Sequence, residues 1–205
     1  MKISVIIPCF NEEKTILKIL EKVNLQKKNL QLEIIVSDDG SKDETISLLK
    51  ENSNLYDSLI ESKINRGKGA ALKKGIEIAS GELILFQDAD LEYDPNDYKK
   101  LIEPFLAHGA DVVYGSRFQG SAAHRLIYFS HRVANFILTI LVNLLTNINF
   151  SDVETGYKVF RKSIMKNIKI NENSFGVEIE VTMKIAKLKA KIFEVGIGYN
   201  GRTYS

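Results

Sequence analysis

The strongest constraint on the fold of this chain is a regular alternation of short apolar segments with longer amphipathic segments. Apolar runs typical of buried strands lie at residues 3–7, 32–36, 83–86 and 111–113. Helical patterns follow them at residues 12–23, 44–50, 68–79 and 96–108. Strands that alternate with helices form a largely parallel sheet with helices on both faces, and such sheets bind ligands beyond the carboxyl ends of their strands. The sequence therefore predicts an α/β fold with its site at those strand ends.

The composition is that of one globular domain, with 205 residues of which 44% are hydrophobic and 26% charged. The formal net charge is +2, and no dense lysine or arginine tract is interleaved with aromatic residues, which argues against nucleic-acid binding. Cys9 is the only cysteine, so an intrachain disulfide is excluded and a reducing compartment is expected. We expect Cys9 to be a buried structural thiol.

The sequence predicts neither a signal peptide nor a transmembrane helix. The apolar run at residues 3–7 is too short for a signal-peptide core and ends at Pro8. Polar residues interrupt the most apolar region, residues 133–150, whereas a membrane-spanning helix needs about 20 mostly apolar residues. Residues 126–145 are rich in Leu, Ile, Val and Phe and have basic residues at their head. This pattern suits either a core helix or a helix on a bilayer surface.

Acidic residues follow the third apolar run, where Asp88 and Asp90 flank Ala89. Side chains alternate faces along a strand, so an extended Asp-Ala-Asp segment places both carboxylates on one side. Two such carboxylates can share one divalent cation that also binds a diphosphate. An acidic turn without a ligand is the alternative interpretation of the same residues.

Polar residues also follow the first two apolar runs, at residues 8–13 and 37–43. Asp38 and Asp39 are adjacent carboxylates that repel each other, and one of them is suited to accept hydrogen bonds from a nucleobase or a ribose hydroxyl. Ser41 and Asp43 are better explained as caps of the next helix.

The segment Asn-Arg-Gly-Lys-Gly at residues 65–69 joins a glycine-rich turn to a helix. It offers backbone N–H groups, a helix start and two cations to a phosphate. The segment is not a Walker A motif, because Gly69 follows Lys68, nor a dinucleotide fingerprint, because Leu72 replaces the third glycine. A flexible turn with solvated side chains is the alternative.

Taken together and in this order, these motifs resemble glycosyltransferase family 2. Within that family the chain is similar, over residues 3–204, to the polyprenyl-phosphate sugar transferases, the relatives of dolichyl-phosphate mannose and glucose synthases. The resemblance implies a GT-A type fold, with a single domain over residues 1–205. It places a nucleotide-sugar and metal half at residues 1–115 and an acceptor half with interfacial helices at residues 116–205.

For the donor, the resemblance implies a nucleotide-sugar pocket and a Mg²⁺ or Mn²⁺ ion. The expected nucleotide-sugar ligands are Pro8, Asn11, Glu12, Asp39, Lys68, Asp88 and Ala89. The expected metal ligands are Asp88, Asp90 and Glu92. Glu92 stands where the mannosyl branch commonly has a glutamine, so its role and the identity of the sugar stay open.

For the acceptor, the segment Gly-Ser-Arg-Phe at residues 115–118 resembles the family's arginine motif, which implies that Arg117 binds the lipid phosphate. The planar guanidinium suits this role because it binds phosphate oxygens in a bidentate manner. Arg125 and Ser130 resemble the pair that continues this phosphate site. On the sugar and acceptor side the resemblance implies Asp152, Thr155, Gly156 and Glu178, with Glu180 also facing the site. Asp152 is expected either to contact sugar hydroxyls or to orient an arginine.

The implied reaction transfers glucose or mannose from a UDP- or GDP-sugar to a polyprenyl phosphate, with inversion at the anomeric carbon. The acceptor phosphate is already ionised at neutral pH, so we nominate no catalytic histidine; His108, His124 and His131 are expected in surface or packing roles. The expected catalytic residues are Asp88, Asp90, Arg117 and Arg202, of which Arg202 would close over the diphosphate. The expected location is the cytoplasmic face of a membrane.

Other functions are compatible with parts of the same sequence. A family 2 transferase could use a soluble glycan or protein acceptor, and an inactive nucleotide-sugar-binding or scaffolding subunit would use the same fold. A nucleotidyltransferase is disfavoured because its glycine-rich, lysine-containing signature is missing from residues 8–13. Relatives usually continue past the last motif with a basic segment, so a shortened chain and a minimal peripheral form are both open, as are the sugar, the polyprenyl acceptor and the oligomeric state.

Overall fold

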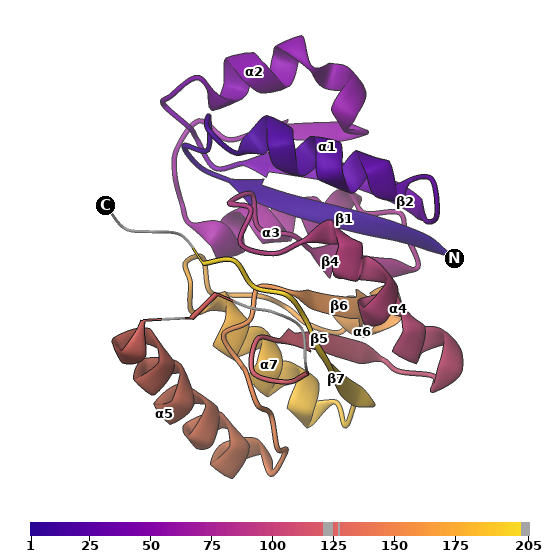
Figure 1. The fold of residues 1–205 in the computed structure, drawn as a ribbon, viewed down its shortest axis with the longest axis vertical. Coiled ribbons are helices and arrows are strands. Elements are labelled where there is room, and N and C mark those ends of the chain that lie inside the picture. Colours follow the sequence, from indigo (N-terminus) through magenta and orange to yellow (C-terminus); the bar gives the residue numbers. More distant parts are fainter. Residues whose placement is uncertain (121–124, 127, 202–205) are drawn as a thin grey trace.

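In the computed structural model, residues 1–120, 125–126 and 128–201 are described. They form a seven-stranded sheet with the strand order β3-β2-β1-β4-β6-β5-β7 (Figure 1). The strands are β1 (Lys2–Cys9), β2 (Gln31–Asp38), β3 (Ser58–Glu61), β4 (Leu83–Phe86), β5 (Val112–Ser116), β6 (Lys158–Arg161) and β7 (Ile192–Gly196). Only β6 runs antiparallel to its neighbours, β4 and β5, among these strands. The largely parallel sheet is therefore confirmed, and β1, β2, β4 and β5 all end at the same edge.

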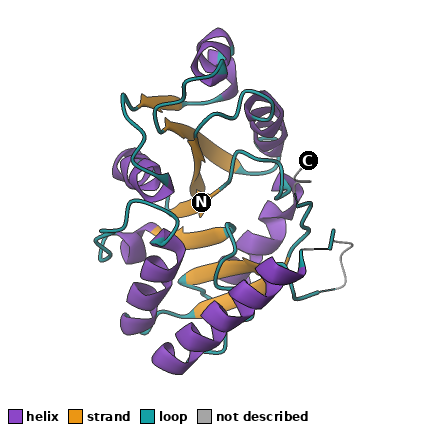
Figure 2. Cartoon of the chain, turned by 90° about the vertical axis from the view of Figure 1, so that its left-hand side faces the viewer, coloured by secondary structure: helices purple, strands orange, loops and turns teal. Residues whose placement is uncertain are grey.

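Helices cover both faces of this sheet (Figure 2). They are α1 (Ile16–Gln26), α2 (Thr45–Glu51), α3 (Lys68–Ile78), α4 (Tyr98–Ala107), α5 (Phe129–Thr146), α6 (Lys162–Met165) and α7 (Val177–Lys187), with short 3-10 helices η1 (Ser53–Leu55) and η2 (Pro95–Asp97). Because strand side chains alternate, β1 sends Ile7 toward the core under α1 and α4, and Ile6 toward the core under α3 and α7. Strands buried on both faces are nearly continuous apolar runs, which explains why their positions could be predicted.

Each predicted strand and helix of the first half is present, with shifted ends. Helix α1 begins at Ile16 instead of residue 12, because residues 12–15 form a turn in which the Glu12 carbonyl accepts from the Thr15 and Ile16 amides. The strands β3, β6 and β7 were not predicted. The first is a short edge strand that is only partly buried, and the other two carry charged residues among their apolar ones.

Helix α5 is amphipathic in the reverse of the usual sense. The side facing the domain includes Asn135, Thr139 and Asn143, and the Asn143 side chain exchanges two hydrogen bonds with the Phe150 backbone, at 2.8 and 3.0 Å. The opposite side exposes its large apolar side chains, Phe129, Phe136, Ile137, Leu141, Leu144 and Leu145. The polar residues that interrupt the apolar pattern in the sequence are thus the ones that hold α5 to the domain.

The length and composition of α5 would also allow it to cross a membrane, and it is the one helix of the described residues that meets this criterion. The sequence pattern did not predict this, because the polar residues reduced the apolar score of the region. Figure 1 shows α5 at the outer edge of the molecule, beside α7. Its apolar side is exposed at this outer edge.

Glu33 on β2 connects the start of the sheet to the turn before β4. Its carboxylate accepts hydrogen bonds from Ser4 Oγ at 2.5 Å and from the Ser80 amide at 2.8 Å, and it pairs with the Lys2 ammonium at 3.0 Å. Burial acts to raise the pKa of Glu33, but the hydrogen bonds from Ser4 and Ser80 outweigh it and lower the pKa to about 2. The ionised form is therefore bound more strongly in the folded than in the unfolded chain.

We expect Glu33→Gln to lower the free energy of unfolding at pH 7 by about 1.5–3 kcal/mol, the usual range for hydrogen bonds to a charged group. Because the folded-state pKa is depressed, the contribution is full above the ordinary value of 4.5 and is lost as the pH falls toward about 2. Urea denaturation at several pH values measures this. Glu61→Gln, which breaks an exposed pair with Lys50, is the matched control and should have little effect. A Glu33→Gln deficit that persists unchanged at pH 2 would contradict the assignment.

Candidate active site

A cleft of about 570 Å³ opens at the carboxyl ends of β1, β2 and β4. Most of the residues predicted for the donor and metal line it: Pro8, Glu12, Asp39, Lys68, Asp88, Ala89, Asp90 and Glu92. The cleft is also lined by Asn65, which belongs to the glycine-rich segment, and by Phe175, which had no predicted role. Asn11, predicted for the same pocket, lines an adjoining hollow of about 540 Å³ together with Glu12, Asp90 and Arg125. The strand-end motifs therefore meet in space as expected.

Asp88 and Asp90 share the cleft for a different reason than the one predicted. Strand β4 ends at Phe86, so both acids lie in the turn that follows and strand alternation does not apply to them. Gln87 fixes the start of this turn: its side chain accepts hydrogen bonds from the hydroxyls of Tyr98 and Tyr157, at 2.8 and 2.7 Å, and donates to the Asp88 carbonyl. The buried Gln87 is therefore the residue that positions the acidic pair.

Asp88 is part of a mostly buried group of three charges. The Lys68 ammonium lies 2.7 Å from Asp88 Oδ1 and 2.8 Å from Glu178 Oε1. Burial alone would lower the pKa of Lys68, but the two carboxylates raise it above its ordinary value, so the amine is charged. The other carboxylate oxygen of Glu178 is buried and has no hydrogen-bond partner within the described residues. The structure thus brings together three residues that were predicted for one site: Lys68, Asp88 and Glu178.

The backbone at residues 66–67 binds a carboxylate of the protein itself. The amides of Arg66 and Gly67 donate to Asp39 Oδ2 at 2.9 and 2.6 Å. In this structure these two N–H groups therefore serve the buried Asp39 carboxylate, and phosphate binding by the segment stays a prediction that would depend on its helix start and its cations. Asp38, the other acid of the pair, accepts hydrogen bonds from the Gly40 and Ser41 amides and so shapes the turn that follows β2.

The two glycines of this segment allow a close approach of another loop. A Cβ atom on Gly67 or Gly69 would collide with the backbone of residues 172–174, and Gly67 also has φ of +104°. The Ala70 amide donates to the Asn173 carbonyl at 3.1 Å. Packing against the loop before α7 thus explains these glycines.

Glu92, predicted as a metal ligand, bonds to the C-terminal segment. Its Oε2 atom accepts a hydrogen bond from the Tyr199 hydroxyl at 2.9 Å, and its carbonyl accepts from the Asn200 amide at 2.9 Å. Asp90 Oδ1 accepts from the Glu92 amide at 3.1 Å. Glu92 therefore joins the acidic turn to the segment that follows β7.

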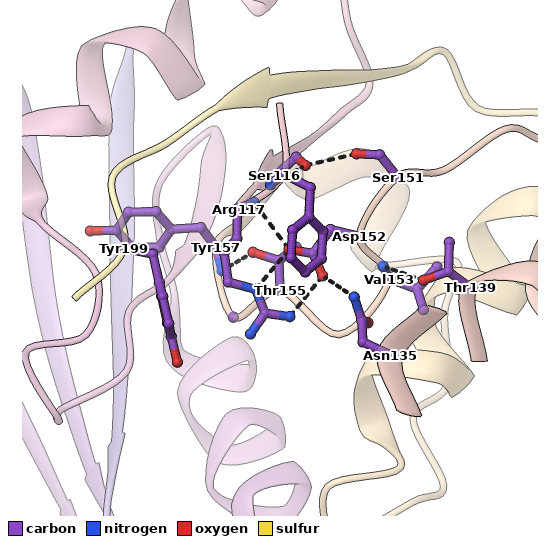
Figure 3. Close-up of polar contacts among 12 residues, drawn as sticks. Ser116, Arg117, Asn135, Thr139, Ser151, Asp152, Val153, Thr155, Tyr157 and Tyr199 are labelled. Carbon is purple, nitrogen blue, oxygen red and sulfur yellow. Dashed lines mark hydrogen bonds and ion pairs between the residues drawn. The ribbon is translucent and has the colours of Figure 1, made fainter. Parts of the chain in front are cut away.

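Arg117 lies just past β5, at the same sheet edge as the acids. It forms a bidentate pair with Asp152, with Nε and Nη2 each 2.7 Å from a carboxylate oxygen, while Asn135 from α5 donates to the same carboxylate at 3.1 Å (Figure 3). Burial alone would lower the pKa of Arg117, but Tyr93 and Asp152 raise it. Of the two roles expected for Asp152, orienting an arginine is the one that this geometry supports.

Aromatic rings flank the Arg117 guanidinium. Its central carbon lies 5.4 Å from the Tyr199 ring centroid and 5.7 Å from that of Phe118. Arg132 of α5 lies over the same Phe118 ring at 5.2 Å. Cation–π contacts and the Asp152 pair together restrict Arg117 to one orientation.

Lys158 is a fully buried lysine to which the sequence pattern gave no role. Its ammonium donates to the carbonyls of Val153 and Thr155, at 3.0 and 2.5 Å, and so fixes the loop between Asp152 and Gly156. Burial lowers the pKa of Lys158 to about 8. The available signal in the sequence was a lysine directly before the apolar pair Val159 and Phe160, which form the short strand β6 with it.

The remaining predicted residues lie as follows. Arg125 is exposed, and its guanidinium donates to the Gly201 carbonyl at 2.9 Å, while Ser130 is exposed in the first turn of α5. Thr155 is buried, and its hydroxyl accepts a hydrogen bond from the Tyr157 amide.

Glu180 was predicted to face the site but binds the Asn171 and Glu172 amides and Lys184 instead. Arg202 and His124 lie outside the described residues.

Asp88 and Asp90 fit part of a Mg²⁺ or Mn²⁺ site. No group of three or more His, Cys, Asp or Glu side chains in the described part of the chain is arranged to hold a metal. Mg²⁺ commonly takes one or two carboxylates and completes its shell with substrate phosphates and water. The acidic pair in an open cleft suits that arrangement.

Gly156 leaves room for the Asp88 carboxylate, since a Cβ atom there would collide with it and with the Tyr93 ring. We expect Gly156→Ala to lower the free energy of unfolding by about 1–3 kcal/mol, because overpacking forces the neighbours to move. Gly198→Ala is the matched control, since its Cβ would meet only Asp97 at 3.5 Å, an ordinary contact. Urea denaturation measures both changes. A Gly156→Ala protein as stable as the unmodified one would show that the space beside Asp88 is not filled.

Comparison with known proteins agrees with this geometry. The family model for glycosyl transferase family 2 matches residues 4–169. An uncharacterised protein of Methanocaldococcus jannaschii is 33% identical, with 98% of this chain and 90% of that protein covered. A dolichol-phosphate mannosyltransferase of Pyrococcus furiosus is 28% identical over 99% of this chain, which spans 59% of that protein.

A solved structure has the same fold. Glucosyl-3-phosphoglycerate synthase from Mycobacterium tuberculosis, in complex with Mn²⁺, UDP and phosphoglyceric acid, superposes with a TM-score of 0.79 at 22% identity, over 98% of this chain and 72% of that one. The GT-A type fold is thereby confirmed. A UDP-N-acetylglucosamine–dolichyl-phosphate N-acetylglucosaminyltransferase of Methanococcus voltae is 32% identical, with 80% of this chain and 71% of that protein covered. The chain therefore belongs to glycosyltransferase family 2 and is a nucleotide-sugar glycosyltransferase similar to the polyprenyl-phosphate sugar transferases.

Proposed function

We propose that this protein transfers glucose or mannose from a UDP- or GDP-sugar to a polyprenyl phosphate on the cytoplasmic face of a membrane, with inversion at the anomeric carbon. The observation that carries the proposal is that one cleft holds Asp39, Lys68, Asp88 and Asp90 together. This combination supplies an acceptor for the base or ribose, a cation for the diphosphate and two carboxylates for a metal. The names of the relatives support the polyprenyl acceptor.

On the donor side, Asp39 is held rigidly by its two backbone donors and presents its carboxylate to the cleft. Asp88 and Asp90 would hold Mg²⁺ or Mn²⁺, which would supply positive charge to the departing diphosphate. Lys68 adds a second positive charge in the same cleft. Positive charge fixed in place before the reaction stabilises a leaving group more effectively than solvent does.

On the acceptor side, Arg117 is oriented by Asp152 and by the rings of Phe118 and Tyr199. The N–H groups that do not face Asp152 are suited to a phosphate, and Arg125 adds charge at the adjoining hollow. A phosphate oxygen attacks without a general base, since it is already ionised. Direct displacement from the side opposite the diphosphate inverts the anomeric carbon.

The exposed apolar side of α5 supports an acceptor carried by a membrane. A soluble protein rarely exposes a row of large apolar side chains, and basic residues near such a row favour an anionic bilayer surface. Arg132 lies on α5 and Arg125 just before it. A helix that lies in the surface of the bilayer would place the lipid phosphate near Arg117.

Product analysis tests the reaction. Purified protein is incubated with Mn²⁺, a polyprenyl phosphate and radiolabelled UDP-glucose or GDP-mannose, and we expect label in the organic phase. Asp90→Asn should lower this transfer by about a hundredfold or more, a loss typical of removing charge stabilisation. Asp94→Asn is the matched control, since Asp94 caps η2 and forms an exposed pair with Lys22, and asparagine also caps helices while exposed pairs contribute little.

The other outcomes separate the alternatives. Label found only on an added soluble glycan or protein would identify a soluble acceptor. No transfer from any donor, with UDP or GDP still bound, would identify an inactive binding subunit. Near-normal transfer by Asp90→Asn would remove the metal role of Asp90.

Vesicle flotation tests the membrane surface. We expect the protein to float with vesicles that contain anionic lipid, and Leu144→Glu combined with Leu145→Glu to weaken binding about tenfold or more, because burying each leucine contributes about 1.5–3 kcal/mol. Both side chains are exposed, at 75% and 73%, so the fold should persist. Leu106→Glu on α4, exposed at 72%, is the matched control. Equal flotation of the double variant and the control would contradict a role for α5.

A further inference from the structure

Lys68 and Asp88 are both expected to act on the donor, yet in the structure they bind each other. The ammonium lies 2.7 Å from Asp88 Oδ1, and Asp88 Oδ2 lies against Gly156. A metal ion that approaches Asp88 therefore meets a carboxylate whose first oxygen is already paired with a cation. Like charges repel strongly at such distances in a mostly buried site.

The position of Lys68 is fixed by its surroundings. It is the first residue of α3, and the peptide before it is held by Asp39 through the Arg66 and Gly67 amides. Contact of Gly67 and Gly69 with residues 172–174 restricts the start of the helix further. The packing at the start of α3 therefore fixes the ammonium beside Asp88.

We propose that Lys68 occupies the place of the divalent cation at Asp88 and makes metal binding depend on the nucleoside diphosphate. This inference rests on the proposed function. A metal alone must compete with the ammonium for Asp88. A diphosphate in the cleft attracts both cations, so the ammonium can move toward phosphate oxygens while Asp88 turns to the metal. Without the nucleotide, Lys68 neutralises Asp88. With the nucleotide bound, it becomes a phosphate ligand.

Glu178 allows this exchange without leaving a buried ammonium unpaired. It holds Lys68 at 2.8 Å from the opposite side, so one carboxylate partner remains when Asp88 turns away. Removing one partner of a buried ion pair is normally costly because the other charge is left alone. The second carboxylate avoids that cost at each stage.

Titration with Mn²⁺, followed by the electron paramagnetic resonance signal of free Mn²⁺, tests the proposal without an activity assay. For the unmodified protein we expect UDP or GDP to raise the affinity for Mn²⁺ about tenfold or more, within the usual range of coupling between two sites. Lys68→Gln should bind Mn²⁺ alone about fivefold tighter or more, and the effect of the nucleotide should fall to the part that phosphate ligands of the metal supply. Lys74→Gln is the matched control, because Lys74 lies on the same helix and donates to Ser62 instead.

Two further measurements keep the result clear of folding effects. Because coupling is reciprocal, Mn²⁺ must raise the nucleotide affinity by the same factor in the unmodified protein, and this factor should also fall in Lys68→Gln. Glu178→Gln should have the opposite effect on Mn²⁺ alone, since Lys68 would then depend on Asp88 and the metal would bind more weakly. Simple charge effects predict these opposite signs as well, so the smaller coupling between nucleotide and Mn²⁺ in Lys68→Gln is the result specific to the proposal.

The outcomes separate this inference from the proposed function. If the unmodified protein binds no Mn²⁺, whether or not UDP or GDP is present, metal use fails and both proposals fall. If nucleotide and Mn²⁺ bind together but Lys68→Gln leaves both the Mn²⁺ affinity and the coupling unchanged, the role of Lys68 is overturned while the transferase proposal stands.

Discussion

The buried contact of Lys68 with Asp88 and Glu178 is the interaction on which the site depends. Lys68 begins α3 and Asp88 lies in the turn after β4, whereas Glu178 lies in the first turn of α7, far along the chain. Leaving a buried charge without a partner costs about 3–5 kcal/mol, so Lys68 requires at least one of the two carboxylates. In the structure the three charges meet where α3, the turn after β4 and α7 pack together.

The order of strands and helices could be predicted in the first half because its strands are buried on both faces. Such strands are continuous apolar runs, as Ile34 to Val36 of β2 illustrate. In the second half the pattern is weaker, because β6 contains Lys158 and ends at Arg161. Lys158 is tolerated in the core because its ammonium donates hydrogen bonds to the Val153 and Thr155 carbonyls. That compensation arises from tertiary contacts, which no local pattern encodes.

The sequence identified which residues gather at the site more successfully than it identified their partners. Parallel strand ends lie at one sheet edge, so Asp39, Asp88 and Arg117 were expected near one another. Their hydrogen bonds depend on burial instead. A carboxylate excluded from water must find donors, so Asp39 takes the amides that were assigned to a phosphate, and Asp152 takes two N–H groups of Arg117. Glu92 likewise turns to Tyr199, a residue distant in sequence.

Helix α5 connects the apolar surface to the acceptor side of the site. Its inward Asn135 donates to Asp152, which holds Arg117, while its outward side exposes leucine and phenylalanine. The same helix therefore sets both the apolar surface and one contact of the arginine. If the apolar side lies in a bilayer, the hydrogen bonds through Asn135 and Asp152 fix the distance of the guanidinium from that surface. A lipid phosphate also keeps a fixed depth in a bilayer, so a rigid connection would bring the two charges to the same level, whereas a freely diffusing acceptor would need no such connection.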